Sequence, residues 1–433
     1  MSDPTSSTAP AARSTGLRAS LGVLRRHRDF RRLYIASLIS LGGDWFLTVA
    51  LFDVVLRLEG TATSVALVII AQELPSFLAA PAAGYLVDRL DRRRLMVVCD
   101  LARAVLVLGF LLIGGESDLW LVYVLLPFIT VFSTAFDPAM EAAMPNLVPS
   151  EDLGPAYSLV GSAWGTMLAV GAAIGGLVVA GLGSTAAFAI DAASFALSAA
   201  MIFSIRSPFA EPHEGEHPRL VEATLETVTY ARRDHRVLAL LVVKGGFGLG
   251  AGVLVLLSVF AERIFLAGAV GIGLLMGARG AGALVGPFLG RAIAGDDDRR
   301  LFAAIGIALA TFGISYVAFG FTPTIAVALP VVFCAHLGGG GQWTLSTYGL
   351  QRLVPDRLRG RIFSFDFALV TLSIAISSLV TGWAADRFGP RPAAIGLGAV
   401  ALAWAITWWF LTGDIRRGGG LSAPSFPDSR NGA

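Results

Sequence analysis

The sequence contains a series of apolar segments, each long enough to cross a lipid bilayer as a helix. A membrane helix needs about 20 mostly apolar residues, and segments of that length recur almost to the end of the chain. We expect twelve spans, at 33–56, 64–87, 95–113, 119–137, 156–180, 185–205, 237–260, 268–290, 301–320, 323–345, 362–384 and 392–412. Because unpaired backbone groups are too costly in lipid, these segments must be helical. The pattern predicts an all-α membrane protein with twelve transmembrane helices.

The composition argues against several other classes of protein. Of the 433 residues, 55% are hydrophobic and only 15% are charged, whereas a soluble domain carries about 25% charged residues. No polar block is long enough to hold a separate catalytic domain. The chain has no phosphate-binding loop, no G-x-S-x-G or H-E-x-x-H motif and no Cys/His cluster. We therefore expect no enzymatic activity, no cofactor, no metal and no nucleic-acid partner.

The twelve spans fall into two groups of six on either side of a polar stretch. We expect a disordered cytoplasmic tail, an N-terminal six-helix bundle, a cytoplasmic central loop, a C-terminal six-helix bundle and a second cytoplasmic tail, at 1–20, 21–205, 206–236, 237–412 and 413–433. The first tail is rich in Ser, Thr, Ala and Pro and cannot bury enough apolar surface to order itself. The stretch 21–33 mixes arginines with leucines, which suits an amphipathic helix on an anionic membrane surface.

The placement of the arginines predicts the orientation in the membrane. With a cytoplasmic N-terminus, 26 of the 33 basic residues fall in segments on the cytoplasmic side and four in the outer loops. Cytoplasmic loops of membrane proteins carry an excess of Lys and Arg. We therefore expect both termini in the cytoplasm and a location in the cell membrane.

The loop after the second span carries the most specific motif, GYLVDRLDRRRLM, which begins at Gly84. It resembles the loop motif of the major facilitator superfamily, G-x-L-a-D-R-x-G-r-k, with Asp91 in place of the usual glycine. The eighth span runs into a similar glycine, Gly286, followed by a basic loop, so the two halves look like a duplication. Four more stretches, at 29–46, 135–153, 187–198 and 350–365, are similar to the exporter subgroup that includes enterobactin exporters and macrolide or multidrug efflux proteins.

This resemblance covers about residues 29–412 and implies the major facilitator fold, with two pseudo-symmetric six-helix bundles. It also implies that the loop motif is a conformational latch, to which we assign Gly84, Asp88, Arg89, Arg92, Arg93, Asp100 and Arg103. Gly84 is expected to let the second helix pack tightly against a neighbour. Asp100 and Arg103 are three residues apart on one helix and can pair. The alternative is that these charges only anchor helix ends among lipid headgroups.

Two other runs differ from the family pattern. In the fifth span, Ala172 stands where exporters of the superfamily often carry proline, which removes the usual cause of a kink there. A second motif-like run, from Gly382 through Asp386 to Arg391, follows the eleventh span. Our topology places it outside the cell, so we do not give it the role of the cytoplasmic loop.

Ionisable residues inside a membrane cost about 2.5–3.5 kcal/mol at the helix centre on insertion scales, so each needs a reason. Asp44 and Glu73 lie in the middle of the first and second spans. A carboxylic acid removed from water favours its neutral, protonated form, so we predict that these two residues carry protons. The alternative is that each is satisfied by local partners and serves packing. Three more acids, Asp137, Glu141 and Asp191, are interpreted as structural.

The remaining candidates would line a substrate cavity. They are Trp164, Lys244, Arg279, Trp343 and Asp366. The two tryptophans stand in Gly/Ser/Thr-rich surroundings that leave space, and Arg279 lies too deep to reach the surface. Lys244 has two readings, a cavity cation or a side chain that extends to the interface.

These observations favour a secondary active exporter that works by alternating access, with proton antiport as the energy source and function as a monomer. Its partners would be protons, membrane lipids and a hydrophobic or amphiphilic small molecule such as a drug, antibiotic, siderophore or other secreted metabolite. A lipid or lysophospholipid translocator is the alternative within transport. A transport-inactive membrane sensor or scaffold is the alternative from another class.

Overall fold

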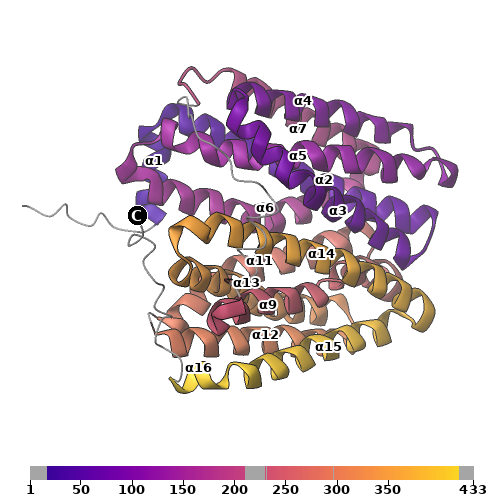
Figure 1. Cartoon of the computed structure of the whole chain (residues 1–433). Helices are drawn as coiled ribbons and strands as arrows, with labels where there is room; N and C mark the ends of the chain where they lie inside the picture. Colours follow the sequence, from indigo (N-terminus) through magenta and orange to yellow (C-terminus); the bar gives the residue numbers. More distant parts are fainter. Residues whose placement is uncertain (1–16, 210–229, 231, 296, 419–433) are drawn as a thin grey trace, which may run out of the picture.

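The computed structural model describes residues 17–209, 230, 232–295 and 297–418, and the regular structure in these residues is entirely helical. Twelve helical segments among them are long and apolar enough to cross a membrane. They form two six-helix bundles that lie side by side, the N-terminal half above the C-terminal half in Figure 1. The fold class predicted from the sequence is confirmed.

The N-terminal half contains one short helix and six long ones. Their bounds are α1 Leu17–Arg26, α2 Arg28–Leu58, α3 Ala62–Arg89, α4 Arg92–Leu108, α5 Trp120–Leu147, α6 Leu153–Leu182 and α7 Ser184–Phe203. Three short 3₁₀ turns, η1 Gly109–Leu112, η2 Glu116–Asp118 and η3 Ser150–Asp152, connect some of them.

The C-terminal half repeats this plan with a broken first span. Its elements are α9 His235–Leu249, α10 Val253–Val259, the π-helical turn η4 Phe260–Ile264, α11 Gly268–Ala294, α12 Asp298–Gly320, α13 Ile325–Leu353, α14 Asp356–Phe388, α15 Pro390–Leu411 and α16 Gly413–Arg417. At the break between α9 and α10, the Gly252 amide donates to Ser377 Oγ over 3.0 Å, and that hydroxyl donates to the Leu249 carbonyl. Helix α14 therefore satisfies the backbone groups that the break leaves free.

Side-chain caps explain where several helices begin. Asp91 accepts a hydrogen bond of 2.8 Å from the Arg94 amide at the start of α4, and Thr61 accepts one of 3.0 Å from Ser64 at the start of α3. An oxygen in this position satisfies one of the free amides of the first helical turn. Asp91 thus has a local role, as a helix cap, at the motif position where the superfamily usually has glycine.

Both described ends of the chain, α1 and α16, lie on one side of the molecule, at the left of Figure 1. We call this the proximal side and the opposite one the distal side. Helix α3 consequently runs from its distal end at Ala62 to its proximal end at Arg89.

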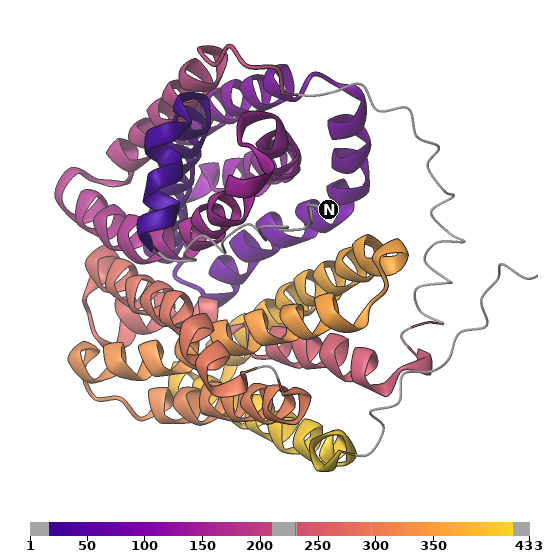
Figure 2. The same cartoon turned by 90° about the vertical axis from the view of Figure 1, so that its left-hand side faces the viewer.

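The buried apolar side chains of the described residues form a shared core in the distal part of the molecule and separate cores at the proximal end. One continuous cluster at the distal end contains residues of both halves, for example Phe52 and Phe260. At the proximal end there are two separate clusters, one around Met144 in the N-terminal half and one around Trp408 in the C-terminal half. Figure 2 views the molecule from this proximal side, with the N-terminal bundle above the C-terminal bundle.

Glycines at the boundary between the halves follow the same division. A Cβ on Gly176 of α6 would lie 3.0 Å from the Cα of Gly273 on α11, so the distal parts of these helices touch through their backbones. At the proximal end, a Cβ on Gly84 would meet nothing within 4 Å, and its neighbour Tyr85 is 52% exposed. The expectation that Gly84 packs tightly is therefore wrong for this conformation, because α3 faces the open side of the molecule there.

Several boundaries differ from the expected ones. Helix α1 begins at Leu17, inside the segment expected to be a disordered tail, and α16 lies inside the expected C-terminal tail. The rest of both tails (1–16 and 419–433) and most of the central loop lie outside the described residues. Helix α5 continues to Leu147, ten residues beyond its expected end, because prolines 138 and 145 are accommodated within it.

Candidate functional site

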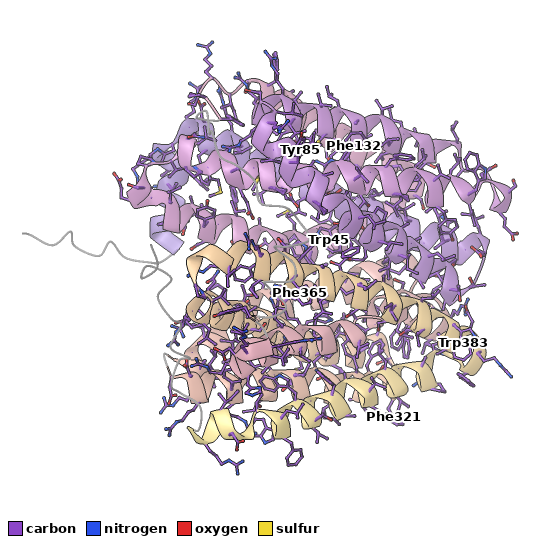
Figure 3. The ribbon with its side chains drawn as sticks, in the orientation of Figure 1. Trp45, Tyr85, Phe132, Phe321, Phe365 and Trp383 are labelled. Atoms are coloured by element: carbon purple, nitrogen blue, oxygen red, sulfur yellow. The ribbon has the colours of Figure 1, made fainter. Side chains whose placement is uncertain are left out.

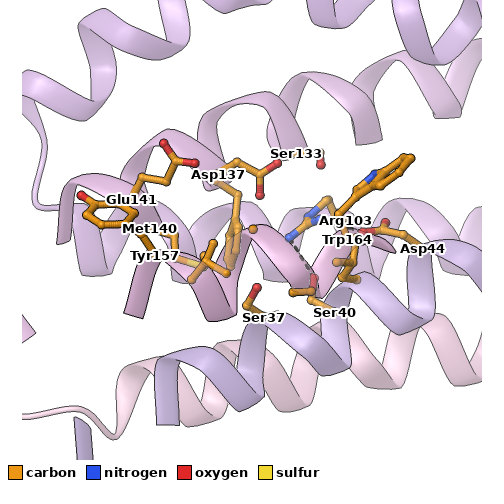
Figure 4. A pocket seen from close by; sticks show the side chains of 15 residues that line it. Ser37, Ser40, Asp44, Arg103, Ser133, Asp137, Met140, Glu141, Tyr157 and Trp164 are labelled. Atoms are coloured by element: carbon orange, nitrogen blue, oxygen red, sulfur yellow. Dashed lines mark hydrogen bonds and ion pairs between the residues drawn. The ribbon is translucent and has the colours of Figure 1, made fainter. Parts of the chain in front are cut away.

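A polar cavity lies inside the N-terminal half. It has a volume of about 350 Å³ and is lined by residues of α2, α4, α5 and α6. Its polar and aromatic lining includes Ser37, Ser40, Asp44, Arg103, Ser133, Asp137, Glu141, Tyr157 and Trp164 (Figure 4). Four charged side chains in a membrane bundle make this cavity the leading candidate for a functional site.

Arg103 is the centre of the cavity's charge network. The side chain comes from α4 and is only 1% exposed. Its guanidinium donates to Asp100 one helical turn away and to Ser40 Oγ at 3.3 Å, and it lies 3.8 Å from Asp44 Oδ2. The rings of Phe136 and Phe195 lie 4.9 and 4.2 Å from its Cζ. Arg103 therefore bridges α2 and α4 between aromatic rings that keep water away.

Acidic groups outnumber the single cation that lines the cavity. Asp44, Asp137 and Glu141 line it together with Arg103, and Asp100 is bound to the arginine behind the wall. A fifth acid, Asp191 of α7, is completely buried, and a Cβ on Gly43 would lie only 2.3 Å from its Oδ1. Unpaired charges are expensive in such surroundings, so the cluster requires protons or a cationic ligand to offset the excess of carboxylates.

The sequence identified only part of this site. Trp164, a predicted cavity residue, lines the cavity, and Asp44, predicted to be a proton carrier, lines it as well. Asp137 and Glu141 were interpreted as structural because the fourth span was expected to end at residue 137, whereas α5 continues past both. Their spacing of four residues, which places them on one helical face, was the available signal.

The second proton-carrier candidate, Glu73, does not line this cavity. It lies on α3, within range of electrostatic interaction with Arg279 of α11. Arg279 itself has its Cζ 5.9 Å from the ring of Trp45 and 5.5 Å from the ring of Trp164. A cation of the C-terminal half thus contacts two aromatic residues of the N-terminal half, and Figure 3 shows Trp45 near that boundary.

The other predicted cavity residues form a smaller cluster in the C-terminal half. Lys244 is 2% exposed and forms an ion pair with Asp366. Its Nζ also donates to Thr347 Oγ1 at 2.8 Å and lies 4.9 Å from the ring centroid of Trp343. The reading of Lys244 as a side chain that extends to the interface is wrong, because Asp366 holds the ammonium group inside the bundle.

The residues assigned to a latch occupy two separate places. Arg92 donates to the carbonyls of Ala142 and Phe209 at 2.8 and 3.1 Å, and Arg93 donates to that of Ile205 at 2.6 Å. Arg89 lies 4.3 Å from the ring of Tyr85 on its own helix, and the side chain of Asp88 is outside the described part.

These contacts all lie within the N-terminal half. The motif arginines therefore tie the start of the central loop to their own half in this conformation. Asp100 and Arg103 belong to the cavity instead, since both lie in its charge network.

Comparison with known proteins places this site in context. A family model described as "Transmembrane secretion effector" matches residues 19–413. The chain is 29% identical to multidrug efflux pump Tap of Mycobacterium tuberculosis over 392 residues, which cover 86% of this chain and 89% of Tap. It is 26% identical to macrolide efflux protein A of Streptococcus pyogenes over 371 residues, which cover 83% and 90% of the two chains.

Solved structures support the fold. The chain is similar to a bacterial homologue of the human lysosomal transporter Spinster in an inward-facing and unoccupied conformation. The TM-score is 0.72 at 13% identity, with 95% of this chain and 100% of the other covered.

Proposed function

This chain belongs to the transmembrane secretion effector family of the major facilitator superfamily, and on that basis we propose that it exports cationic, amphiphilic small molecules in exchange for protons. The relatives described above are efflux proteins for drugs or antibiotics, which supports an efflux transporter of the same kind. Alternating access of one site to the two sides of the membrane is the mechanism that we propose.

The observation that carries this proposal is the excess of carboxylates in the cavity. Asp44, Asp137 and Glu141 face the same space as the aromatic side chains of Tyr157 and Trp164. Ligand pockets combine apolar and aromatic walls with a few placed polar groups. A cationic group would pair with the carboxylates while an apolar body packs against the rings, so a basic amphiphile matches both parts of the wall.

The same carboxylates explain why protons would exchange with the cargo. A buried acidic cluster is stabilised either by protons or by a cationic ligand, but the two compete for the same negative charges. Binding of the cargo would therefore release protons, and reprotonation would expel the cargo. In this way one set of side chains couples the two fluxes without a separate coupling site.

We further propose that the proximal side faces the cytoplasm of a cell membrane. The loops on that side carry most of the arginines, as the positive-inside rule requires. The cavity would then take cargo from the cytoplasm or the inner leaflet in the conformation described here, in which the halves diverge on the proximal side.

Transport in proteoliposomes tests this function. The purified protein is reconstituted into liposomes that contain a pH dye. A proton gradient is then imposed across the membrane, and ethidium is added as the cationic probe. We expect ethidium-dependent proton movement that is lost in the double variant Asp44→Asn/Asp137→Asn. Asp118→Asn serves as the control, because the hydrogen bonds that the structure shows to Asp118 come from nearby residues, Gly114, Gly115 and Ser117, at 2.9, 3.2 and 3.4 Å.

The outcomes also separate the alternatives. Movement of a labelled lysophospholipid between leaflets without coupled ethidium flux would support a lipid translocator. No flux of either probe in the wild-type protein would support a transport-inactive sensor or scaffold. Proton-coupled ethidium flux that persists in the double variant would contradict the assignment of coupling to this cavity.

A further inference from the structure

The motif-like run after the eleventh span has no role in the site described above, yet it forms several hydrogen bonds between the two halves. It lies at the distal end of α14, opposite the first turn of α3. The Asp386 carboxylate accepts hydrogen bonds from the Ala62 amide at 2.7 Å, the Thr63 amide at 2.9 Å and the Thr63 hydroxyl at 2.7 Å. Arg263 of η4 lies 3.7 Å from the same carboxylate.

This contact completes the N-terminus of α3. The first turn of any helix has amide groups without partners inside the helix, and the helix dipole makes that end attractive to negative charge. Within its own half, Thr61 satisfies the Ser64 amide. The two amides before it, of Ala62 and Thr63, are satisfied by Asp386, which belongs to the other half. One half of the molecule therefore caps a helix of the other half.

The glycine of the same run lets the two helices approach. A Cβ on Gly382 would lie 2.9 Å from Ala66 Cβ and 3.1 Å from the Ala62 carbonyl oxygen. Any side chain at this position would push α14 away from α3 and lengthen the Asp386 contacts. Gly382 and Asp386 are one helical turn apart and therefore lie on the same face of α14. Gly382 supplies the close approach to the backbone of α3, and Asp386 supplies the carboxylate.

The corresponding residues of the proximal motif are in the opposite situation. Gly84 has open space where its Cβ would be, and the motif arginines bind carbonyls of their own half. The distal run is thus engaged between the halves, whereas the described side chains of Arg92 and Arg93 in the proximal motif bind their own half. Separating the halves distally would expose the Ala62 and Thr63 amides and the carboxylate at once.

We propose that Asp386 is a positioning residue that latches the distal side closed, and that its release from Ala62 and Thr63 opens that side. This proposal rests on the alternating-access cycle of the proposed function, because only such a cycle requires the distal contact to break. Gly382 is the second component of the latch, since it sets the distance over which Asp386 reaches α3.

Distance measurements between spin labels test the latch without any cargo. Labels are placed at Thr185→Cys and Thr324→Cys, two exposed distal positions in different halves, in a Cys99→Ala/Cys334→Ala background. Double electron–electron resonance in lipid nanodiscs then reports the distal separation of the halves. We expect Asp386→Asn to move the distribution toward longer distances, because the amide loses the negative charge and one acceptor.

Two further variants make the result decisive. Gly382→Ala should produce the same shift by a steric route, and Asp118→Asn, which removes a distal carboxylate that binds amides of its own half, should produce none. Unchanged distances in both Asp386→Asn and Gly382→Ala would overturn the latch and leave Asp386 as a static cap. Absence of transport by the wild-type protein would instead contradict the proposed function, and the label distances would still decide the latch.

Discussion

At the scale of single residues, Arg103 determines how the cavity can hold charge. Its guanidinium is the only cation among the described residues that line the cavity, and it lies between Asp100 and Asp44 on two different helices. The sequence indicated the pair with Asp100 from the spacing on one helix. The contact with Asp44 depends on how α2 packs against α4, which spacing along the chain does not encode.

We predict that Arg103→Met strongly destabilises the protein, because Asp100 then remains buried without its ion-pair partner. Breaking a buried ion pair by removing one partner costs about 3–5 kcal/mol. The double variant Asp100→Asn/Arg103→Met should recover much of the lost stability, because neither position then carries a buried charge. Thermal unfolding midpoints in detergent measure both effects. A single variant as stable as the wild type would show that the pair contributes little to the fold.

At the scale of helices, the two motif glycines make opposite contributions. On α11, a Cβ on Gly286 would lie 2.3 Å from the Leu337 carbonyl oxygen of α13, whereas on α3 a Cβ on Gly84 would meet nothing within 4 Å. The two residues occupy corresponding positions in the sequence of the halves. Only one of them is needed for helix packing in this conformation.

We therefore predict that Gly286→Ala destabilises the protein and Gly84→Ala does not. Overpacking of a close contact costs about 1–3 kcal/mol, and alanine in an exposed helical position is favoured over glycine. The unfolding midpoints of the two variants, compared in the same detergent, test this. Equal losses in both variants would mean that Gly84 also packs against a neighbour.

A third prediction concerns the anchoring of the central loop. Arg92 binds the carbonyls of Ala142 and Phe209, so Arg92→Ala should loosen the segment that follows α7. Trypsin cleavage after the exposed Arg206 should become faster, measured by mass spectrometry over time. Arg89→Ala is the matched control, because Arg89 contacts the ring of Tyr85 on its own helix. Equal cleavage rates in Arg92→Ala and the wild type would contradict the anchor.

The helices themselves were predictable, because the thickness of the bilayer sets the length of each apolar segment. All twelve spans appear at the expected places. The errors lie at their ends, where the membrane imposes no limit, as in the continuation of α5 to Leu147. Those extra turns carry Glu141 into the cavity, so an error at a helix end became an omission from the site.

At the scale of the whole molecule, the described parts of the two halves share an apolar core distally and have separate apolar cores at the proximal end. The sequence indicated two similar bundles. It could not indicate at which end the bundles pack together, because conformations closed at either end would contain the same helices. The sequence identified the charged residues but not which of them lie close together, as the separation of Glu73 from Asp44 shows. Packing between helices that are distant in the sequence decides which residues become neighbours.

The proposed orientation predicts which positions a membrane-impermeant thiol reagent reaches in intact cells. Thr185→Cys lies on the distal side and should be labelled from outside. Glu151→Cys, at an exposed position of η3 on the proximal side and outside the cavity, should be labelled only after the membrane is opened. Both variants carry Cys99→Ala and Cys334→Ala. The reverse pattern would place the proximal side outside the cell.

Proton release on cargo binding shows whether the acidic cavity holds either protons or a cation. Ethidium is added to the detergent-solubilised protein in weakly buffered solution near neutral pH, and a pH dye records the protons released. We predict net release from the wild-type protein and from Asp118→Asn, and none from Asp44→Asn/Asp137→Asn. Saturable ethidium binding to the wild-type protein without proton release would contradict the claim.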